Sequence, residues 1–287
     1  MTAVFKRELK SFFTGMMGYI LAAFFVLVGG LYFTAVNLQQ GYSYFGYTLY
    51  NTCFVFLIYV PVLTMRSFAE ERHSRTDQLL LTSPVSLPRI VLGKYLAHMA
   101  VFLLPLAIFA VCPLLLKAGG EYSALSSYAA LFGYVLLGSA CISIGLFVSS
   151  LTENQILAVV GSFAILFVTY MMDGIRGLFT AGGSLALFVF AGLLLLIALA
   201  TGLNTKSMTT GCITFAVGAA VLLVLFKLRS AALTTAFSAM LSFFSLFGPF
   251  EYFVGDIFSL SAAVYYISIT AAFLFFTVQS LEKRRWN

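Results

Sequence analysis

Long apolar runs dominate this sequence and leave few folds open to it. Of its 287 residues, 61% are hydrophobic and 9% are charged, whereas a soluble domain carries about 25% charged residues. Runs such as 17–36 and 257–278 are long enough to cross a bilayer, which takes roughly 20 helical residues. Backbone polar groups in lipid need internal partners, and a helix supplies them. The sequence therefore predicts an all-α, polytopic integral membrane protein.

Eight apolar runs qualify as predicted spans. Besides the two above, they cover about 52–65, 90–116, 128–149, 156–172, 184–200 and 212–226. Thr152 and Gln155 have the T-x-x-Q spacing of a capping box before the fifth span. A further run, 231–247, contains several Ser and Thr residues and is broken by Gly248 and Pro249. This run is either a ninth span or part of an external hairpin, 231–256, that is re-entrant or lies on the surface.

The distribution of basic residues favours the hairpin. Cytoplasmic segments of membrane proteins carry an excess of Lys and Arg. With the hairpin, eight spans leave both termini in the cytoplasm, together with most of the 16 Lys and Arg residues. A ninth span would move Lys283, Arg284 and Arg285 outside. The net charge of +6 is then explained by cytoplasmic loops, and no nucleic-acid partner is expected.

Residues 2–14 form a predicted amphipathic helix. Phe5 and Leu9 share one face, and the bases Lys6, Arg7 and Lys10 lie on the other. The segment is too short to cross a bilayer but has the pattern of a helix in the membrane interface, in contact with lipid.

Residues 66–94 are the long polar interruption between two predicted spans. Ser74 and Asp77 have the spacing of a helix start, and Leu79 and Leu80 follow as apolar positions. Ser86 and Pro88 then fit the cap and first turn of the next helix. Two interpretations remain open from the residues alone. Either the charges only set the topology, or a short surface helix docks on another protein.

Motifs that would give this chain its own chemistry are missing from the sequence. It contains no H-E-x-x-H, no G-x-S-x-G, no phosphate-binding G-x-x-x-x-G-K-S/T and no C-x-x-C. His73 and His98 are isolated, and no charged residue falls clearly within a predicted span, which argues against an ion-coupled carrier. We expect no cofactor and no metal on this chain, and any energy for work to come from another chain.

The order of these features resembles an ABC-2-type exporter permease, most closely the gliding-motility permease group. The most specific part is E-E-R-x-x-x-T-x-x-x-L-L-x-(S/T)-P-V-S at 70–86, supported by the S-S-L-T-E-N-Q turn and the final R-R-W. Similar features cover 4–162 and about 243–286. The departure is 181–230, which looks like two extra spans inserted into the six-span core usual in the superfamily. The resemblance implies one transmembrane domain over 1–287.

The resemblance also implies a function and partners. Two permease subunits, alike or different, would pair in a bacterial cytoplasmic membrane, and a separate ATP-binding subunit would bind ATP and Mg. In the gliding-motility group a further membrane subunit with an external domain joins. Segment 2–14 would be a connecting helix, and 66–94 would hold the coupling helix that docks on the ATP-binding subunit. The implied coupling residues are Glu70, Glu71, Arg72, Arg75, Thr76, Asp77, Leu79 and Leu80.

The rival function is a membrane scaffold that transports nothing, or a membrane-embedded enzyme. An enzyme needs polar side chains that converge at one depth in the membrane, and the sequence pattern indicates none. The resemblance therefore favours the permease, which would not itself be an enzyme.

Overall fold

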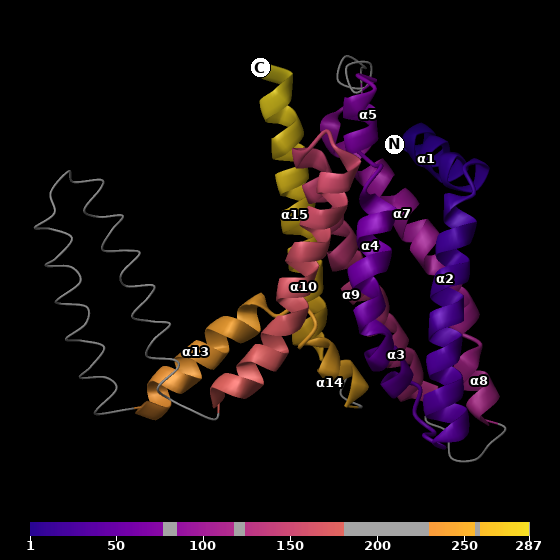
Figure 1. Cartoon of the computed structure of the whole chain (residues 1–287), viewed down its shortest axis with the longest axis vertical. Helices are drawn as coiled ribbons and strands as arrows, with labels where there is room; N and C mark the ends of the chain where they lie inside the picture. The colour runs from indigo at the N-terminus through magenta and orange to yellow at the C-terminus, as the bar shows by residue number, and fades with distance from the viewer. Residues whose placement is uncertain (77–84, 118–123, 181–229, 256–258, 287) are drawn as a thin grey trace, which may run out of the picture. The chain divides into compact units, whose positions relative to one another are not determined.

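The computed structural model describes residues 1–76, 85–117, 124–180, 230–255 and 259–286 (Figure 1). Every regular element in these ranges is a helix, which confirms the predicted all-α class. The elements are α1 (Thr2–Thr14), α2 (Met17–Tyr32), a π-helical continuation η1 (Phe33–Gln39), α3 (Gly46–Thr52), a 3-10 turn η2 (Cys53–Val55), α4 (Phe56–Thr64), α5 (Ala69–His73), α7 (Leu87–Phe109), α8 (Cys112–Lys117), α9 (Ala124–Leu151), α10 (Gln155–Thr180), α13 (Ser230–Phe244), α14 (Phe250–Val254) and α15 (Leu260–Trp286).

Six helical segments within the described residues are long and apolar enough to cross a membrane. They are Met17–Gln39, Gly46–His73, Leu87–Leu116, Leu125–Leu151, Gln155–Ile175 and Leu260–Arg284. The predicted spans at 184–200 and 212–226, and with them nearly all of the predicted 181–230 insertion, lie outside the described residues. The count of eight therefore stays a prediction.

The chain divides into two units. Met1–Val168 together with Pro249–Asn287 form the first, and Thr169–Gly248 form the second. In the first unit α9 is the central helix. Most of its length is buried, and it packs on α15, α4, α14, α7 and α3.

Aromatic side chains fill the core of the first unit. The ring of Phe25 in α2 lies 5.1 Å from that of Tyr59 in α4 and 5.9 Å from that of Phe102 in α7. Tyr134 of α9 lies 4.7 Å from Phe56 of α4 by ring centroids. Gly138 of α9 allows this packing, because a Cβ there would lie 2.5 Å from the Phe102 ring. The core therefore depends on large rings set against a position that has no side chain.

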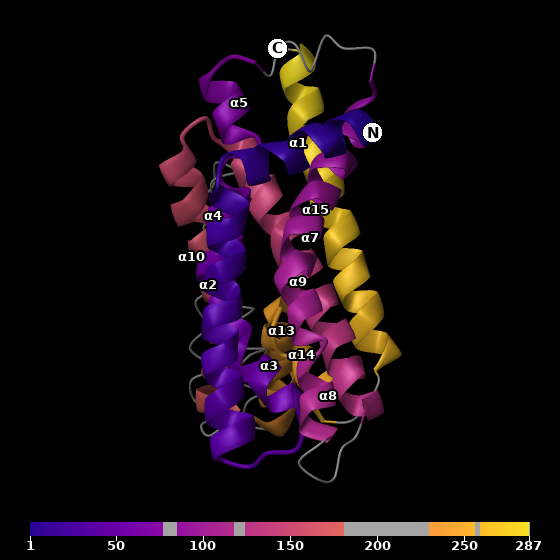
Figure 2. The same ribbon diagram turned by 90° about the vertical axis from the view of Figure 1, so that its right-hand side faces the viewer.

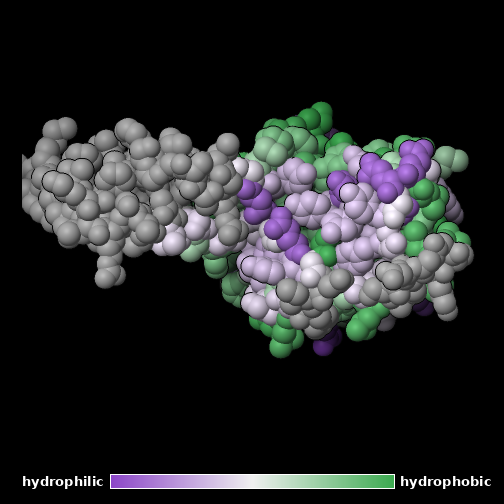
Figure 3. Space-filling model, turned by 90° about the horizontal axis from the view of Figure 1, so that it is seen from below, coloured by the Kyte–Doolittle hydropathy of each residue, from purple (hydrophilic) through white to green (hydrophobic). Residues whose placement is uncertain are grey.

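Figure 2 shows α1 lying across the ends of α2 and α7, on both of which it packs. Helix α5 and the C-terminal end of α15 lie at this same end of the first unit (Figure 1). The opposite end carries exposed tyrosines, Tyr42, Tyr47, Tyr50 and Tyr252. Figure 3 views the structure from that side, where hydrophilic and near-neutral side chains gather between hydrophobic ones. The first unit thus has a charged end, which bears α1 and α5, and a tyrosine-rich end.

The start of α10 differs from the predicted capping box. Asn154 Oδ1 accepts a hydrogen bond from the backbone N–H of Ile156 at 2.9 Å, so Asn154 caps the helix in place of Thr152. Thr152 Oγ1 instead accepts from the N–H of Asn154 at 3.2 Å. The helix begins two residues later than a Thr152 cap requires, and it continues beyond the expected end at 172 to Thr180.

The second unit is described at 169–180 and 230–248. Ser245 Oγ donates to Asp173 Oδ2 at 2.7 Å and accepts from the N–H of Gly248 at 2.9 Å, and the rings of Tyr170 and Phe247 lie 5.1 Å apart. The predicted break at Gly248 and Pro249 is confirmed, because α13 ends at Phe244. Within the described residues α13 has 15 residues, fewer than the roughly 20 that a span needs.

Candidate functional site

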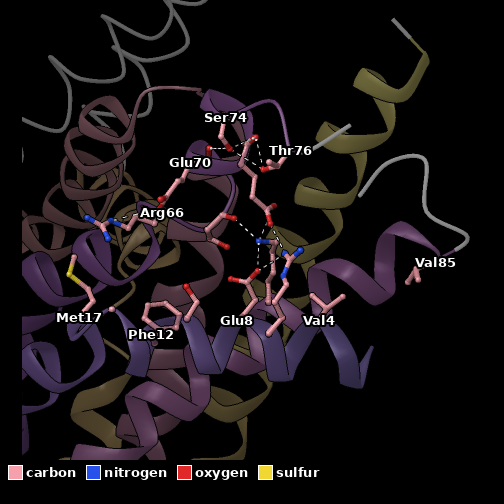
Figure 4. Close-up of a pocket in the computed structure, with 15 residues that line it drawn as sticks. Val4, Glu8, Phe12, Met17, Arg66, Glu70, Ser74, Thr76 and Val85 are labelled. Carbon is pink, nitrogen blue, oxygen red and sulfur yellow. Dashed lines mark hydrogen bonds and ion pairs between the residues drawn. The ribbon is translucent and has the colours of Figure 1, made fainter. Parts of the chain in front are cut away.

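Three segments meet at the charged end of the first unit: α1, residues 66–76 and the start of α7. A pocket of about 740 Å³ lies between them (Figure 4). Helix α1 contributes side chains such as Glu8 and Phe12, 66–76 contributes Glu70 and Glu71, and α7 contributes Lys94. Residues that sequence analysis assigned to two separate roles therefore border the same pocket.

The amphipathic pattern of α1 explains how it lies on α7. Gly93 of α7 has no side chain, and a Cβ there would lie 3.2 Å from Val4 Cβ, so α1 approaches closely. The ring of Phe12 meets the buried ring of His98 edge-on at 5.1 Å. The predicted apolar residues Phe5 and Leu9 are half-buried, while the bases Lys6, Arg7 and Lys10 are exposed. The predicted helix over 2–14 and its two faces are confirmed.

Helix α5 begins earlier than the helix predicted from Ser74. The N–H groups of Phe68 and Ala69 donate to Ser149 Oγ of α9 at 3.2 and 3.3 Å, so a side chain from another helix satisfies the start of α5. Ser74 lies at its end, where Ser74 Oγ donates to the Glu70 carbonyl at 2.9 Å. Arg75 then adopts the left-handed region with φ 56°. The predicted helix start at Ser74 is therefore wrong, because Ser74 ends α5 and Arg75 leaves the helical conformation. Asp77, predicted for the first turn of that helix, lies outside the described residues.

Lys94 is the centre of the site. Its side chain is 1% exposed, and its ammonium donates to the Ser67 carbonyl at 2.6 Å and to Glu8 Oε1 at 3.0 Å. Glu71 Oε2 lies 3.0 Å from the same nitrogen. Because an ammonium has three donors, all of them have a partner here. The ammonium also lies 5.0 Å from the centre of the Phe68 ring.

Arg7 completes a neutral four-charge cluster of Arg7, Glu8, Glu71 and Lys94. The Arg7 guanidinium donates to Glu71 Oε1 at 2.6 Å and to Glu8 Oε1 at 2.8 Å. Burial alone would raise the pKa of Glu8, but the Lys94 charge and the hydrogen bonds from Arg7 and Lys94 outweigh it. The pKa of Glu8 therefore lies below its ordinary value, and Glu8 is ionised at neutral pH.

The other predicted coupling residues lie in different surroundings. Glu70 is exposed on the pocket and lies 3.9 Å from the half-exposed Arg66. Arg75 and Thr76 are exposed, and Thr76 borders the pocket. Arg72 was expected among the exposed charges but is 5% exposed, because α5 turns this face toward the protein. Asp77, Leu79 and Leu80 lie outside the described residues.

The pairing of Glu8 with Lys94 was not predicted from the sequence. Lys94 was expected among the loop charges that set topology, whereas it is the eighth residue of α7 and is buried. The signal that could have found the pair was a lysine within an apolar helix, which requires a partner. Glu8 is the one acid in the amphipathic segment 2–14.

His98 lies one turn beyond Lys94 and is fully buried. Its Nδ1 lies 2.7 Å from the Lys94 carbonyl, as expected of a histidine packed in the protein. Across the part of the chain that the structure describes, no group of three His, Cys, Asp or Glu side chains is placed to hold a metal ion. The chemistry visible at this site is charge pairing.

The fold and site define a multi-pass membrane protein with a charged surface element held at one end of its spans. Residues 2–172 match the family described as ABC-2 family transporter protein. This match covers more than half of the chain, including α1 and the pocket, and the chain belongs to that family. It is therefore a permease component of an ABC transporter, a class that generally works with an ATP-binding subunit. Searches of curated proteins and of solved structures found no match.

Proposed function

We propose that this chain couples ATP hydrolysis by a separate subunit to export of a substrate across a bacterial cytoplasmic membrane. The observation that carries the proposal is the junction of α1, 66–76 and α7 at one end of the first unit, bound together by the four-charge cluster. A partner that pushes on 66–94 would act on an element tied to the spans. Closure of the ATP-binding subunits, which hold ATP and Mg, would then shift the spans between two packed arrangements.

The exposed charges and the leucines have different roles in this proposal. Glu70, Arg75 and Thr76 are exposed near the pocket and would orient the partner. Leu79 and Leu80 would enter an apolar groove on the ATP-binding subunit and hold it. The absence of a phosphate-binding loop from the full sequence supports a separate source of ATP hydrolysis.

A photo-cross-linking residue at Thr76 tests where the partner docks. We expect Thr76 to capture the ATP-binding subunit in native membranes, because it is exposed beside the proposed docking segment. Leu125 is the matched control, since it is 86% exposed and lies at the far end of α9 from Ser149. Capture from Leu125 and not from Thr76 would place the partner at the other end and refute the proposal.

We also propose eight spans with both termini in the cytoplasm and 231–256 as an external hairpin. Support comes from the basic residues and from α1 and the end of α15, which lie at the same end of the first unit. In intact cells, Asn287→Cys should not react with a membrane-impermeant thiol reagent, whereas Tyr42→Cys should. Both variants need a background in which the four native cysteines are replaced. Labelling at 287 would contradict this topology.

The resemblance further supports a complex of two permease subunits and two ATP-binding subunits. Within the family, the E-E-R to P-V-S run at 70–86 favours the gliding-motility group, in which a further membrane subunit with an external domain joins. The mass of the complex isolated from native membranes tests this composition. A complex with a single permease subunit would contradict the pairing.

A further inference from the structure

The pocket beside the four-charge cluster separates two segments that must act together in the proposed function. Side chains of α1 line one side of it, and side chains of 66–76 line another. An open pocket means that close packing does not fix the spacing of the two segments there. Ionic contacts join the two segments: Lys94 pairs with Glu8 and Glu71, and Arg7 pairs with Glu71. The spacing is therefore set by charges.

Lys94 dominates these contacts because it belongs to a third helix, α7, and because its side chain is buried. It projects from α7, and its ammonium reaches Glu8 of α1 and both Ser67 and Glu71 of the other segment. At 1% exposure, the ammonium has no water with which to replace a partner. Separating the two segments would break a hydrogen bond to this buried charge, so the contacts of Lys94 oppose their separation.

Arg66 provides a contrast within the same pocket. It also carries a positive charge, but it is 51% exposed and lies 3.9 Å from Glu70, four residues along its own segment. Exposed pairs of this kind do little to fix the relative position of their two residues, because water replaces either partner at small cost. Its pairing also joins no second segment. Lys94 and Arg66 are thus a matched pair of pocket cations with opposite expected effects.

We infer that Lys94 is a positioning residue that makes α1 and segment 66–76 move as one rigid body. The inference rests on the proposed function only for its consequence in the assembled transporter. There, a push on the coupling segment moves α1 as well, and α1 continues through Gly15 and Met16 directly into the first span. The movement then reaches the spans on either side of 66–94 and also the span that begins at Met17.

The first test uses the isolated permease and needs no partner. Spin labels at Lys10→Cys in α1 and His73→Cys in α5, both exposed positions, report the distance between the two segments. The four native cysteines are replaced by alanine. The labelled chain without further changes is the parent. We expect a single narrow distance distribution in the parent and in Arg66→Met. This distribution should broaden in Lys94→Met and become narrow again in Lys94→Arg. A distribution in Lys94→Met as narrow as the parent's overturns the inference.

Folding is controlled within the same experiment. A variant must elute as a single species in detergent before its distance distribution is interpreted. If Lys94→Met does not, Glu8→Gln removes the bond from α1 to Lys94, while Glu71 and Ser67 still bind Lys94. The pair of Arg7 with Glu71 remains, but Arg7 is 54% exposed and water can replace this bond at small cost. We expect Glu8→Gln to broaden the distance between α1 and α5. A narrow distribution in Glu8→Gln then overturns the inference.

The second test uses the complex with its ATP-binding subunit, trapped with ADP and vanadate, and adds a reference label at Leu125→Cys. In the parent, trapping should change the distances from Leu125 to both Lys10 and His73 and leave the distance from Lys10 to His73 unchanged. In Lys94→Met, only the distance from Leu125 to His73 should change. A change between Lys10 and His73 in the parent overturns the rigid body. Failure of any ATP-binding subunit to bind would refute the proposed function and leave the first test decisive for Lys94.

Discussion

Leu79→Asp is expected to remove the ATP-binding subunit from the purified complex. Leu79 lies outside the described residues, and the expectation comes from the sequence, in which an apolar position follows a charged segment at the water boundary. Burying one leucine in a partner's groove contributes roughly 1.5–3 kcal/mol. Losing that contribution weakens binding by about 10- to 150-fold, and an aspartate adds a buried charge. The subunit ratio in detergent, measured on stained gels or by mass, reports the loss.

The matched control for Leu79→Asp is Arg75→Asn. Arg75 is exposed and has φ 56°, a conformation that asparagine accepts, so this change removes a nearby charge without disturbing the backbone. Arg72 would be a poor control because it is buried. We expect Arg75→Asn to keep the subunit ratio of the parent. If Leu79→Asp keeps it too, Leu79 rests on lipid headgroups and does not anchor the partner.

The double variant Glu8→Gln with Glu71→Gln is expected to lose about 3–5 kcal/mol of stability, the usual cost of leaving a buried charge without its partner. Lys94 would keep the Ser67 carbonyl but lose both carboxylates. The loss should far exceed that from breaking the exposed Arg66–Glu70 pair, worth about 0–1 kcal/mol. Thermal or SDS unfolding of the detergent-solubilised chain measures the difference.

Adding Lys94→Met to the double variant separates charge from packing. Methionine has a similar length and no charge, so it removes the unpaired ammonium from the pocket wall. The triple variant should recover a large part of the lost stability, because burying an apolar side chain needs no ionic partner. A triple variant less stable than the double one would mean that Lys94 contributes through something other than its carboxylate partners.

The spans and α1 could be predicted because their signals are local. A long apolar run needs no knowledge of the rest of the chain, and the alternation of Phe5 and Leu9 with Lys6 and Lys10 fixes both the helix and its faces. The break at Gly248 and Pro249 could be predicted for the same reason, since these two residues disfavour a helix interior. The all-α class followed from these segments.

The site could be predicted only in part because its decisive contacts join distant residues. Lys94 and Glu8 are 86 positions apart, and Ser149 caps α5 from 80 positions away. Those partners are chosen by packing, which no spacing rule describes. At Thr152 a motif matched but Asn154 accepts the capping hydrogen bond, and at Ser74 the hydroxyl donates back to the Glu70 carbonyl at the end of α5. Capping signals indicate that a helix end is near, and tertiary contacts decide at which residue the helix begins or ends.

Purification of the tagged chain from its native membrane, with mass and ATP hydrolysis measured on the product, tests the central claim most directly. We expect a complex of two permease chains and two ATP-binding subunits that hydrolyses ATP, while the isolated chain neither binds nor hydrolyses it. ATP binding by the isolated chain at micromolar concentration would contradict the account. A native complex that contains no nucleotide-binding protein would contradict it equally.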